Sequence, residues 1–504
     1  MVSVLPPIDV HDQAAFDALQ SKLVALWRSI DHMSEEPQTI VAVPSIDVDM
    51  VLTPDQVQGY EERYLFLLLL LRQPNAHMVY VTGQEIDPEI IDYYLDLLPG
   101  VERADGRRRL HLVSPRQATS VPLTAKLLTH PETIEEIRSF IPDPDRAHMI
   151  PFMATWSDRE LAMRLAIPMY GTDPRFAVLG TKSSGRRLFD EVGVSHPVGV
   201  NDVRTREDVV DAVVEIRRVR SNVSGVVIKT DVGVSGFGNT IVDLIGLPEA
   251  GTPEERNAVG QRLERLAVAS PAMTTEDYFR ALSAEGGIVE EMVEGAEIRS
   301  PSAQMRVTPL GEVELLSTHD QVLGGESGQI FMGSRFPADP DYASLIGDEA
   351  MKVGRRLGEL GVIGRFAVDF VVARNGGEAC RAYAIEINLR KGGTTHPYLT
   401  LQFLTDGSYD GSTGLFRTPE GNPKFYVASD HLDAPGMAGR TPGEVVALAR
   451  SHRLAFDAER QAGSVFHMMR ALGETGQVGV TCVGDSPSDA QRRYEETAAF
   501  LAVS

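Results

Sequence analysis

Short apolar runs alternate with amphipathic stretches from residue 39 to residue 170. Strands are predicted at residues 39–43, 77–82, 110–113 and 149–153, and helices at residues 54–71 and 88–98. Strands that alternate with helices are typical of a parallel sheet covered on both faces. We therefore expect an α/β domain here. Residues 170–174 (YGTDP) are rich in turn formers and mark its predicted end.

The pattern changes from residue 182 onwards. We expect helices at residues 183–191, 205–218 and 344–360, and strands at 226–229, 240–244, 366–372 and 381–387. Between residues 240 and 316, strand, turn and strand dominate. The rest of the chain is predicted to form a smaller α/β unit with a strand at residues 478–483 and a closing helix at 488–501. A chain of 504 residues is too long for one hydrophobic core, so two or three domains are expected.

Composition and charge exclude several classes of partner. The chain has 48 Lys and Arg against 71 Asp and Glu, a net charge of −23. Such a surface repels phosphate backbones and anionic lipids, so neither nucleic acid nor a membrane is an expected partner. The only cysteines, Cys380 and Cys482, suggest neither disulfides nor zinc. No signal peptide is recognised, and the longest apolar run is far shorter than the ~20 residues of a membrane span, so we expect a cytoplasmic protein.

The first stretch with chemical potential is a glycine-rich loop. A predicted strand ends at Lys229 and is followed by Gly233, Gly236 and Gly238. Glycines let backbone N–H groups approach phosphate oxygens closely, and the lysine supplies positive charge. The spacing is not a Walker A motif. On its own, such a turn between strands is more often a plain hairpin.

The second stretch is an acidic strand end. Glu290 and Glu291 end an apolar strand, a turn follows at Gly295, and Glu297 comes next. Adenine can lie against such a segment while a carboxylate accepts hydrogen bonds from ribose hydroxyls. A hairpin with solvated glutamates is the alternative.

The third stretch carries the strongest signal. Asp369 lies within one apolar strand, and Glu386 and Asn388 share a face of the next because side chains repeat every two residues. Carboxylates buried in a sheet need a partner, and magnesium takes oxygen ligands of these kinds. Arg390 follows on the same face and could stabilise a phosphoryl group or an oxyanion. A salt bridge between Arg365 and Asp369 is the alternative.

These three stretches, in this order, resemble the ATP-grasp superfamily. The resemblance implies phosphate binding by Lys182, Lys229 and the loop Gly233, Ser235, Gly236, Phe237 and Gly238; adenine binding by Glu290, Glu291, Met292 and Val293; ribose binding by Glu297; and magnesium binding by Asp369, Glu386 and Asn388. Every polar position of the pattern holds a competent residue. A decayed, inactive copy is therefore not expected.

A wider likeness connects the chain to the pheganomycin-type peptide ligases. The segments that carry it are VPSIDVDM, HMVYVTGQEI, EINLRKGGTTHP and YVASDHL. It implies a Rossmann-like pre-ATP-grasp domain over residues 1–174, an ATP-grasp domain with two lobes over 175–410 and a small family-specific domain over 411–504. Members of that family join an unusual amino acid derivative to a peptide.

We therefore expect an ATP- and magnesium-dependent ligase that joins a carboxylate to an amine through an acyl phosphate. Lys229, Arg390 and Arg335 are the predicted catalytic residues. Arg335 ends a glycine-rich stretch, residues 324–335, which is either a mobile lid over the substrate or an ordinary exposed loop. His396 is either a base toward the amine or a structural histidine. An ester-forming ligase, a kinase and a non-catalytic nucleotide-binding protein stay open as alternatives, and a homodimer is expected.

Overall fold

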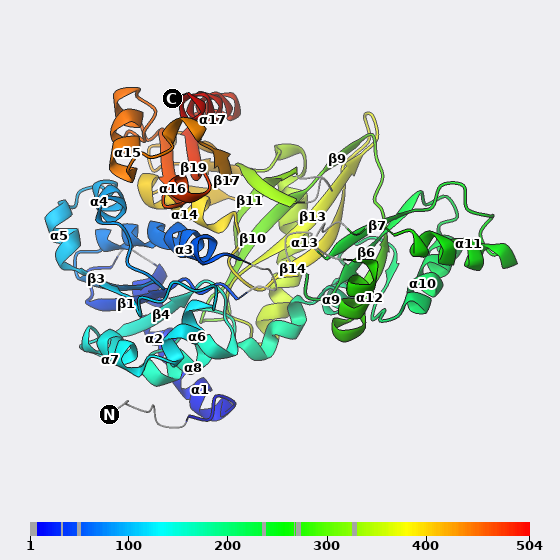
Figure 1. Ribbon diagram of the computed structural model, residues 1–504, viewed down its shortest axis with the longest axis horizontal. Helices are drawn as coiled ribbons and strands as arrows, with labels where there is room; N and C mark the ends of the chain where they lie inside the picture. The colour runs from blue at the N-terminus through cyan, green and yellow to red at the C-terminus, as the bar shows by residue number, and fades with distance from the viewer. Residues whose placement is uncertain are drawn as a thin grey trace.

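The computed structural model describes residues 8–31, 34–47, 52–233, 238–266, 268, 274–324 and 330–503. Three bodies surround a long central sheet (Figure 1). The N-terminal α/β unit and the C-terminal helices lie at one end of this sheet, and a small lobe lies at the other. No helix among these residues is long and apolar enough to cross a membrane.

The N-terminal unit contains the predicted parallel sheet. Its strands are β1 (Gln38–Val43), β2 (Ala76–Val81), β3 (Leu110–Val113) and β4 (Ala147–Pro151), in the order β3-β2-β1-β4. The helices of this unit are α1 (Gln13–Gln20), α2 (Lys22–Asp31), α4 (Pro88–Asp96), α5 (Arg103–Arg108), α6 (Leu123–Leu128), α7 (Pro131–Ser139) and α8 (Trp156–Leu165). Apolar side chains from both faces of the sheet enter separate cores, which confirms a sheet covered on both sides.

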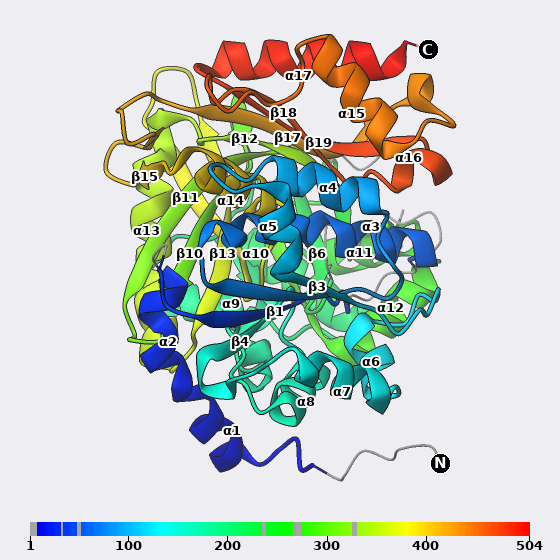
Figure 2. The same ribbon diagram turned by 90° about the vertical axis from the view of Figure 1, so that its left-hand side faces the viewer.

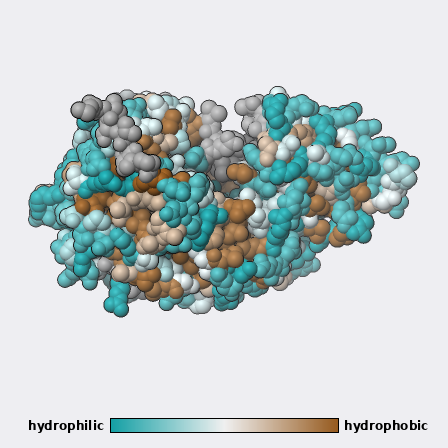
Figure 3. Space-filling model, turned by 90° about the horizontal axis from the view of Figure 1, so that it is seen from below, coloured by the Kyte–Doolittle hydropathy of each residue, from teal (hydrophilic) through white to brown (hydrophobic). Residues whose placement is uncertain are grey.

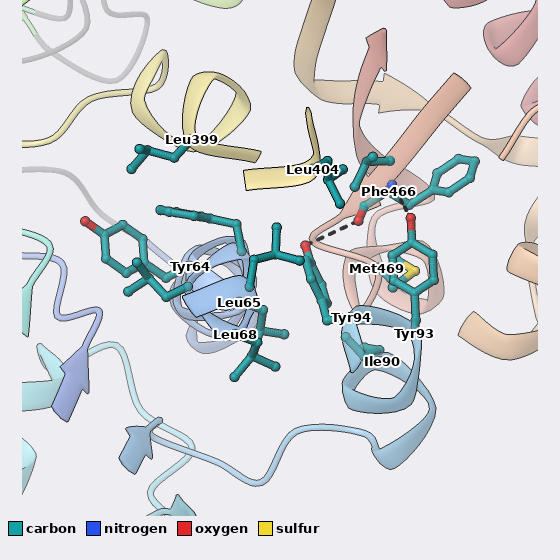
Figure 4. Packing of buried hydrophobic residues seen from close by; sticks show 14 of the residues in the cluster. Tyr64, Leu65, Leu68, Ile90, Tyr93, Tyr94, Leu399, Leu404, Phe466 and Met469 are labelled. Atoms are coloured by element: carbon teal, nitrogen blue, oxygen red, sulfur yellow. Dashed lines mark hydrogen bonds between the residues drawn. The ribbon is translucent and has the colours of Figure 1, made fainter. Parts of the chain in front are cut away.

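One predicted helix of this unit is wrong in form. Residues 54–71 divide into α3 (Pro54–Glu62), which a capping box at Thr53 begins, and η1 (Arg63–Arg72), a 3₁₀ helix. Long 3₁₀ helices are uncommon. Almost every side chain of η1 is buried, so tertiary packing fixes its form. In this core, Tyr93 and Tyr94 hydrogen-bond the Phe466 backbone and tie the unit to the C-terminal strands (Figure 4).

The small lobe has an antiparallel sheet of four strands. These are β5 (Gly199–Val200), β6 (Gly225–Thr230), β7 (Asn239–Asp243) and β8 (Gly287–Glu291), in the order β5-β8-β6-β7. Helices α10 (Arg206–Val219), α11 (Pro253–Glu264) and α12 (Thr275–Glu285) cover it. The prediction that strands dominate between residues 240 and 316 is therefore wrong, since α11 and α12 intervene. Only three residues of α11 are buried, which leaves little apolar periodicity to detect.

The central sheet has nine strands among the described residues. They are β9 (Glu297–Arg299), β10 (Pro301–Val307), β11 (Val313–Gly324), β12 (Ile330–Phe336), β13 (Gly364–Arg374), β14 (Arg381–Asn388), β17 (Phe425–Asp433), β18 (Gly463–His467) and β19 (Gln477–Gly484). Helices α9 (Lys182–Val192) and α13 (Pro340–Glu359) pack against it. This arrangement confirms the mixed α/β fold class.

The C-terminal residues complete this sheet. Strand β17 pairs with β12, and β19 and β18 follow in the order β12-β17-β19-β18. Helix α17 (Pro487–Ala502) packs against β17 and β19 (Figure 2). The strand and closing helix predicted here are confirmed, but the strands form no sheet of their own. The boundaries at residues 174 and 410 stay predictions.

The remaining elements are short connections, with one exception. They are η2 (Pro144–Arg146), η3 (Pro174–Gly180), α14 (Thr395–Thr405), β15 (Ser408–Asp410), β16 (Leu415–Arg417), η4 (Pro435–Met437), α15 (Pro442–Ser451) and α16 (Ala471–Glu474). Helix α14 is the exception because it is almost wholly buried. The outer surface is largely hydrophilic, and hydrophobic residues gather toward the middle of the face in Figure 3. This agrees with the charge of −23.

Candidate active site

A cleft of about 720 Å³ brings together most of the predicted site residues. The small lobe contributes Lys229 and residues 290–293, and the central sheet contributes Asp369, Glu386, Asn388 and Arg390. The N-terminal unit closes the cleft with Tyr60, Arg63 and Phe152. The cleft is therefore large enough for a nucleotide and a further small molecule.

Two cations hold the buried carboxylate of Glu290. Lys229 Nζ donates a hydrogen bond to Glu290 Oε1, and Arg186 Nη1 lies 3.2 Å from Glu290 Oε2. Paired charges of this kind offset part of the cost of burying a carboxylate. The sequence analysis missed Arg186. The only signal is its place next to Arg187, where helical geometry buries one arginine and exposes the other.

Lys182 connects the glycine-rich loop to the carboxylates of the central sheet. The lysine begins helix α9, and its side chain is 5% exposed. Its Nζ donates a hydrogen bond to the Gly233 carbonyl and lies 3.1 Å from Glu386 Oε1. A cation at this position can attract the negative charge of a triphosphate.

The glycine-rich loop is described only at its two ends. A Cβ atom at Gly233 would lie 2.8 Å from Thr230 Oγ1, and one at Gly238 only 2.4 Å from the same atom. A side chain at either end would therefore displace the Thr230 hydroxyl, so glycine is favoured at both positions. Ser235, Gly236 and Phe237 lie outside the described residues, so their phosphate contacts stay predictions.

The strand that is predicted to hold adenine has one backbone donor to offer. The N–H groups of Glu291 and Met292 already bond the carbonyls of Val198 and Gly225, at 2.8 and 2.9 Å. The Glu291 carboxylate is occupied by the Val198 N–H and by Arg220. Among these residues, the Val293 N–H alone has no partner in the described part of the chain. We therefore expect this group to bind an adenine ring nitrogen.

Glu297 does not line the cleft. Its carboxylate accepts hydrogen bonds from Arg299 and Arg374, at distances from 2.5 to 3.1 Å, and these lower its pKa. The next residue of β9, Ile298, faces the cleft instead. Ribose binding by Glu297 stays a prediction that this placement does not support.

The three predicted magnesium ligands lie together. Asp369 and Glu386 are direct partners in the β13–β14 pair, and Asn388 Nδ2 donates a hydrogen bond of 3.0 Å to Asp369 Oδ2. Desolvation in the cleft and then the Glu386 charge raise the pKa of Asp369 to about 6. Two carboxylates that repel each other, next to the side-chain amide of Asn388, offer oxygen donors of the kinds that Mg²⁺ takes. Among the described residues, Arg365 forms no ion pair with Asp369, so the alternative salt bridge is not formed.

The two arginines predicted to be catalytic have different surroundings. Arg390 lines the cleft near Glu386 and Asp369, and its Nη1 lies 3.3 Å from the Lys391 carbonyl. Arg335 is exposed, and its guanidinium lies 3.5 Å from Gln491 on α17. The structure therefore separates Arg335 from the reacting groups. Residues 325–329 of the predicted lid lie outside the described part of the chain.

His396 belongs to a buried polar cluster beside the cleft. Its Nε2 lies 3.1 Å from His467 Nε2 and 3.3 Å from Asp430 Oδ1. Asp430 also accepts a bond of 2.5 Å from Arg63. Burial lowers the pKa of His396 to about 3, so its imidazole is neutral near pH 7. This arrangement favours a structural histidine. The sequence pattern held no signal for Arg63, since its partners come from distant segments.

Two family models match the chain. Residues 264–412 match the model described as IQCH-like, ATP-grasp, and residues 444–497 match the PGM1 C-terminal domain. The L-propargylglycine–L-glutamate ligase of Streptantibioticus cattleyicolor is 31% identical over 480 residues, which cover 93% of this chain and 95% of that protein. The IQ motif-containing protein H of Danio rerio is 22% identical over 90% of this chain, but the match spans only 47% of that protein.

Solved structures share the fold. An N5-carboxyaminoimidazole ribonucleotide synthetase in complex with ADP has a TM-score of 0.53 at 10% identity, covering 92% of this chain and 97% of that one. The N5-carboxyaminoimidazole synthetase of Staphylococcus aureus, also in complex with ADP, has a TM-score of 0.51 at 9% identity, covering 94% and 100%. At these identities, the likeness concerns the fold alone.

Proposed function

This chain belongs to the ATP-grasp ligases, the family of the L-propargylglycine–L-glutamate ligase, and we propose that it joins two amino acids or an amino acid and a peptide. It is an ATP-dependent enzyme that forms amide bonds. The observation that carries the proposal is the position of Lys182, whose Nζ lies 3.1 Å from Glu386. This contact supports the proposal because it pairs one predicted phosphate-binding cation with one predicted metal-binding carboxylate of the cleft.

The residues of the cleft divide into groups with separate tasks. Lys182 and Lys229 would hold the triphosphate, and the Val293 N–H would hold the adenine. Asp369, Glu386 and Asn388 would hold magnesium, which supplies positive charge to the β- and γ-phosphates when bound. The carboxylates that Lys182 and Lys229 contact in this structure keep both ammonium groups in place until phosphate oxygens replace them.

Two displacements make up the proposed reaction. An oxygen of the substrate carboxylate attacks the γ-phosphorus, the bond to the β-phosphate oxygen breaks, and ADP leaves. The amine nitrogen then attacks the acyl carbon of the acyl phosphate. Loss of the phosphate and of one amine proton leaves the amide. Arg390 lies beside the carboxylates and can stabilise the oxyanion formed in the second step.

The part of the cleft near the N-terminal unit is the expected site for the amino acid substrates. Tyr60 and Phe152 supply aromatic surface there, and the Arg63 guanidinium lies 4.8 Å from the centre of the Tyr60 ring. The relative named above takes L-propargylglycine and L-glutamate, which are both free amino acids. That relationship supports the proposal of amino acid substrates for this chain. A homodimer and a cytoplasmic location stay predictions.

Trapping of the acyl phosphate tests the proposal. The purified chain is incubated with ATP, magnesium, single amino acids and hydroxylamine, and hydroxamate and nucleotide products are measured. Hydroxamate together with ADP is expected for the amino acid whose carboxylate is activated. The matched control is Glu386→Gln, which should form neither. AMP with pyrophosphate would contradict the proposal, and ADP with a stable phosphorylated product would indicate a kinase.

A further inference from the structure

A second cavity, of about 290 Å³, lies between the N-terminal sheet, η1, α14 and the start of β13. Lys391 lines this cavity, whereas its neighbours Arg390 and Gly392 line the ATP cleft. Residues 390–392 therefore form a wall between the two spaces. None of the predicted site residues that the structure describes lines the second cavity. The proposed reaction does not use this cavity either.

The lining of this cavity has an excess of positive charge. Arg306 and Arg365 are direct partners across the β10–β13 pair. Like charges at directly opposite positions destabilise a sheet. Glu314, 2.6 Å from Arg306 Nε, balances one of the two. No carboxylate is found among the groups that act on Arg365; these are Arg306 and the three tyrosines Tyr64, Tyr170 and Tyr398.

Lys391 adds a second cation that lacks a carboxylate in contact. The side chain is 7% exposed, and its Nζ donates a hydrogen bond of 2.6 Å to the Pro151 carbonyl. Burial, and then the charge of Arg365, lower the pKa of Lys391 to about 7. His148 also lines the cavity, and its buried Nδ1 has no hydrogen-bond partner among the described residues. Buried charges and polar atoms are costly unless a partner satisfies them.

A further basic side chain of the lining, that of Arg72, is already neutralised. Arg72 makes two hydrogen bonds to Asp406, at 2.7 and 2.8 Å. Asp158, the carboxylate that acts on Lys391, is itself held by Thr124 and Thr155. An anion that entered the cavity would thus find Arg365 and Lys391 available.

The rest of the lining is apolar and sets the character of the ligand. The residues are Ile40, Phe66, Leu67, Leu70, Leu399 and Phe403, among others. A volume of about 290 Å³ suits one small molecule. We propose that this cavity binds a carboxylate with a short apolar side chain, of the size of an aliphatic amino acid or 2-oxo acid, with its oxygens between Arg365 and Lys391. The ligand would also fix the backbone next to Arg390 and so influence the ATP cleft.

Trp27 provides a reporter at this site. The Arg306 guanidinium lies 4.9 Å from the centre of the Trp27 ring, which is 5% exposed. The chain has two tryptophans, Trp27 and Trp156. A Trp156→Phe chain therefore reports only on Trp27. We would titrate this full-length chain, without nucleotide, with valerate, L-valine, inorganic phosphate and the neutral isostere pentanamide.

We expect valerate or L-valine to change the Trp27 fluorescence in a saturable way, and pentanamide to have no effect. Arg365→Gln and Lys391→Met should weaken binding at least tenfold. Leu70→Phe fills the apolar part of the cavity and keeps both cations, so it tests the site if a charge variant does not fold. Asp369→Asn should bind as well as its parent does, which separates this site from the ATP reaction.

Three results would overturn the inference. The first is the absence of a saturable change with either carboxylate. The second is binding that survives both Arg365→Gln and Leu70→Phe unchanged. The third is saturation by phosphate alone, which would replace the carboxylate with an inorganic oxyanion. None of these results bears on amide formation.

Discussion

Lys182 Nζ lies 3.1 Å from Glu386 Oε1, although 204 positions separate the two residues in the chain. The lysine begins the helix next to the small lobe, and the glutamate lies two residues before the end of a strand of the central sheet. The contact therefore marks the point where the two lobes that hold ATP meet. In the proposed reaction, the ammonium group would bind phosphate oxygens and the carboxylate would bind a divalent cation.

Lys182→Met should lower kcat/KM for ATP by on the order of 10²-fold, because a charge aimed at the transferred phosphate is lost. Lys352→Met is the matched control, since Lys352 lies on α13 and pairs with Glu349. Steady-state ADP release checks both. Equal activity of the two variants would show that Lys182 takes no part in binding ATP or in phosphoryl transfer.

Arg186→Met should raise KM for ATP and lower the Tm, since Glu290 would then have a single cationic partner. Removing one partner of a buried ion pair costs about 3 kcal/mol or more. Arg187→Met changes the next residue of the same helix, whose guanidinium is exposed and pairs with Asp202. A thermal melt and ATP kinetics compare the two. We expect the control to match the parent chain in both.

Asp369→Asn should abolish turnover and yet stabilise the ligand-free protein above pH 6. The pKa of Asp369 in the folded chain, about 6, lies above its ordinary value of 3.8. Folding therefore favours the protonated form, and the ionised carboxylate destabilises the fold at pH 8 by on the order of 1–3 kcal/mol. This cost disappears as the pH falls from 6 to below 4. Melts at pH 8 and pH 5 should show a stabilisation at pH 8 that shrinks at pH 5.

The same carboxylate sets the acid limit of activity. Magnesium binding requires the ionised form, so the rate should fall as the pH drops through about 6. The measurement is the pH dependence of kcat/KM for ATP at two magnesium concentrations. More magnesium should move the acid limit to lower pH, since the cation competes with the proton. An acid limit that magnesium does not move would assign it to another group.

Arg335→Ala should retain at least half of the parent kcat, because the side chain is exposed and contacts α17 outside the cleft. Arg390→Ala, in the same assay, should lose on the order of 10²-fold or more. A large loss from Arg335→Ala would mean that β12 moves toward the reacting groups during turnover.

The sequence was informative where one strand dictates the geometry. Glu386 and Asn388 had to share a face, and register then placed Asp369 opposite Glu386. The alternation of strands and helices likewise predicted the N-terminal sheet, because that pattern can be followed along one continuous segment. Such features depend on spacing along a single segment or on two adjacent strands.

Features that depend on distant segments were missed. Arg63 meets Asp430 across 367 positions, and no local pattern signals such a pair. Arg335 has the residue type of a catalytic group and follows a glycine-rich stretch. In the structure, however, its guanidinium lies beside Gln491 of α17 and not among the residues that line the cleft. The cavity near Arg365 combines two adjacent strands with η1 and α14, so its excess charge is visible only in three dimensions.

Isotope transfer tests the central claim most directly. The amino acid substrate is labelled with ¹⁸O in both oxygens of the reacting carboxylate, and the products of one full turnover with ATP and an amine are analysed by mass spectrometry. Activation as an acyl phosphate predicts one ¹⁸O atom in the released inorganic phosphate, together with ADP. Label in AMP, or phosphate without label beside a fully formed amide, would contradict it.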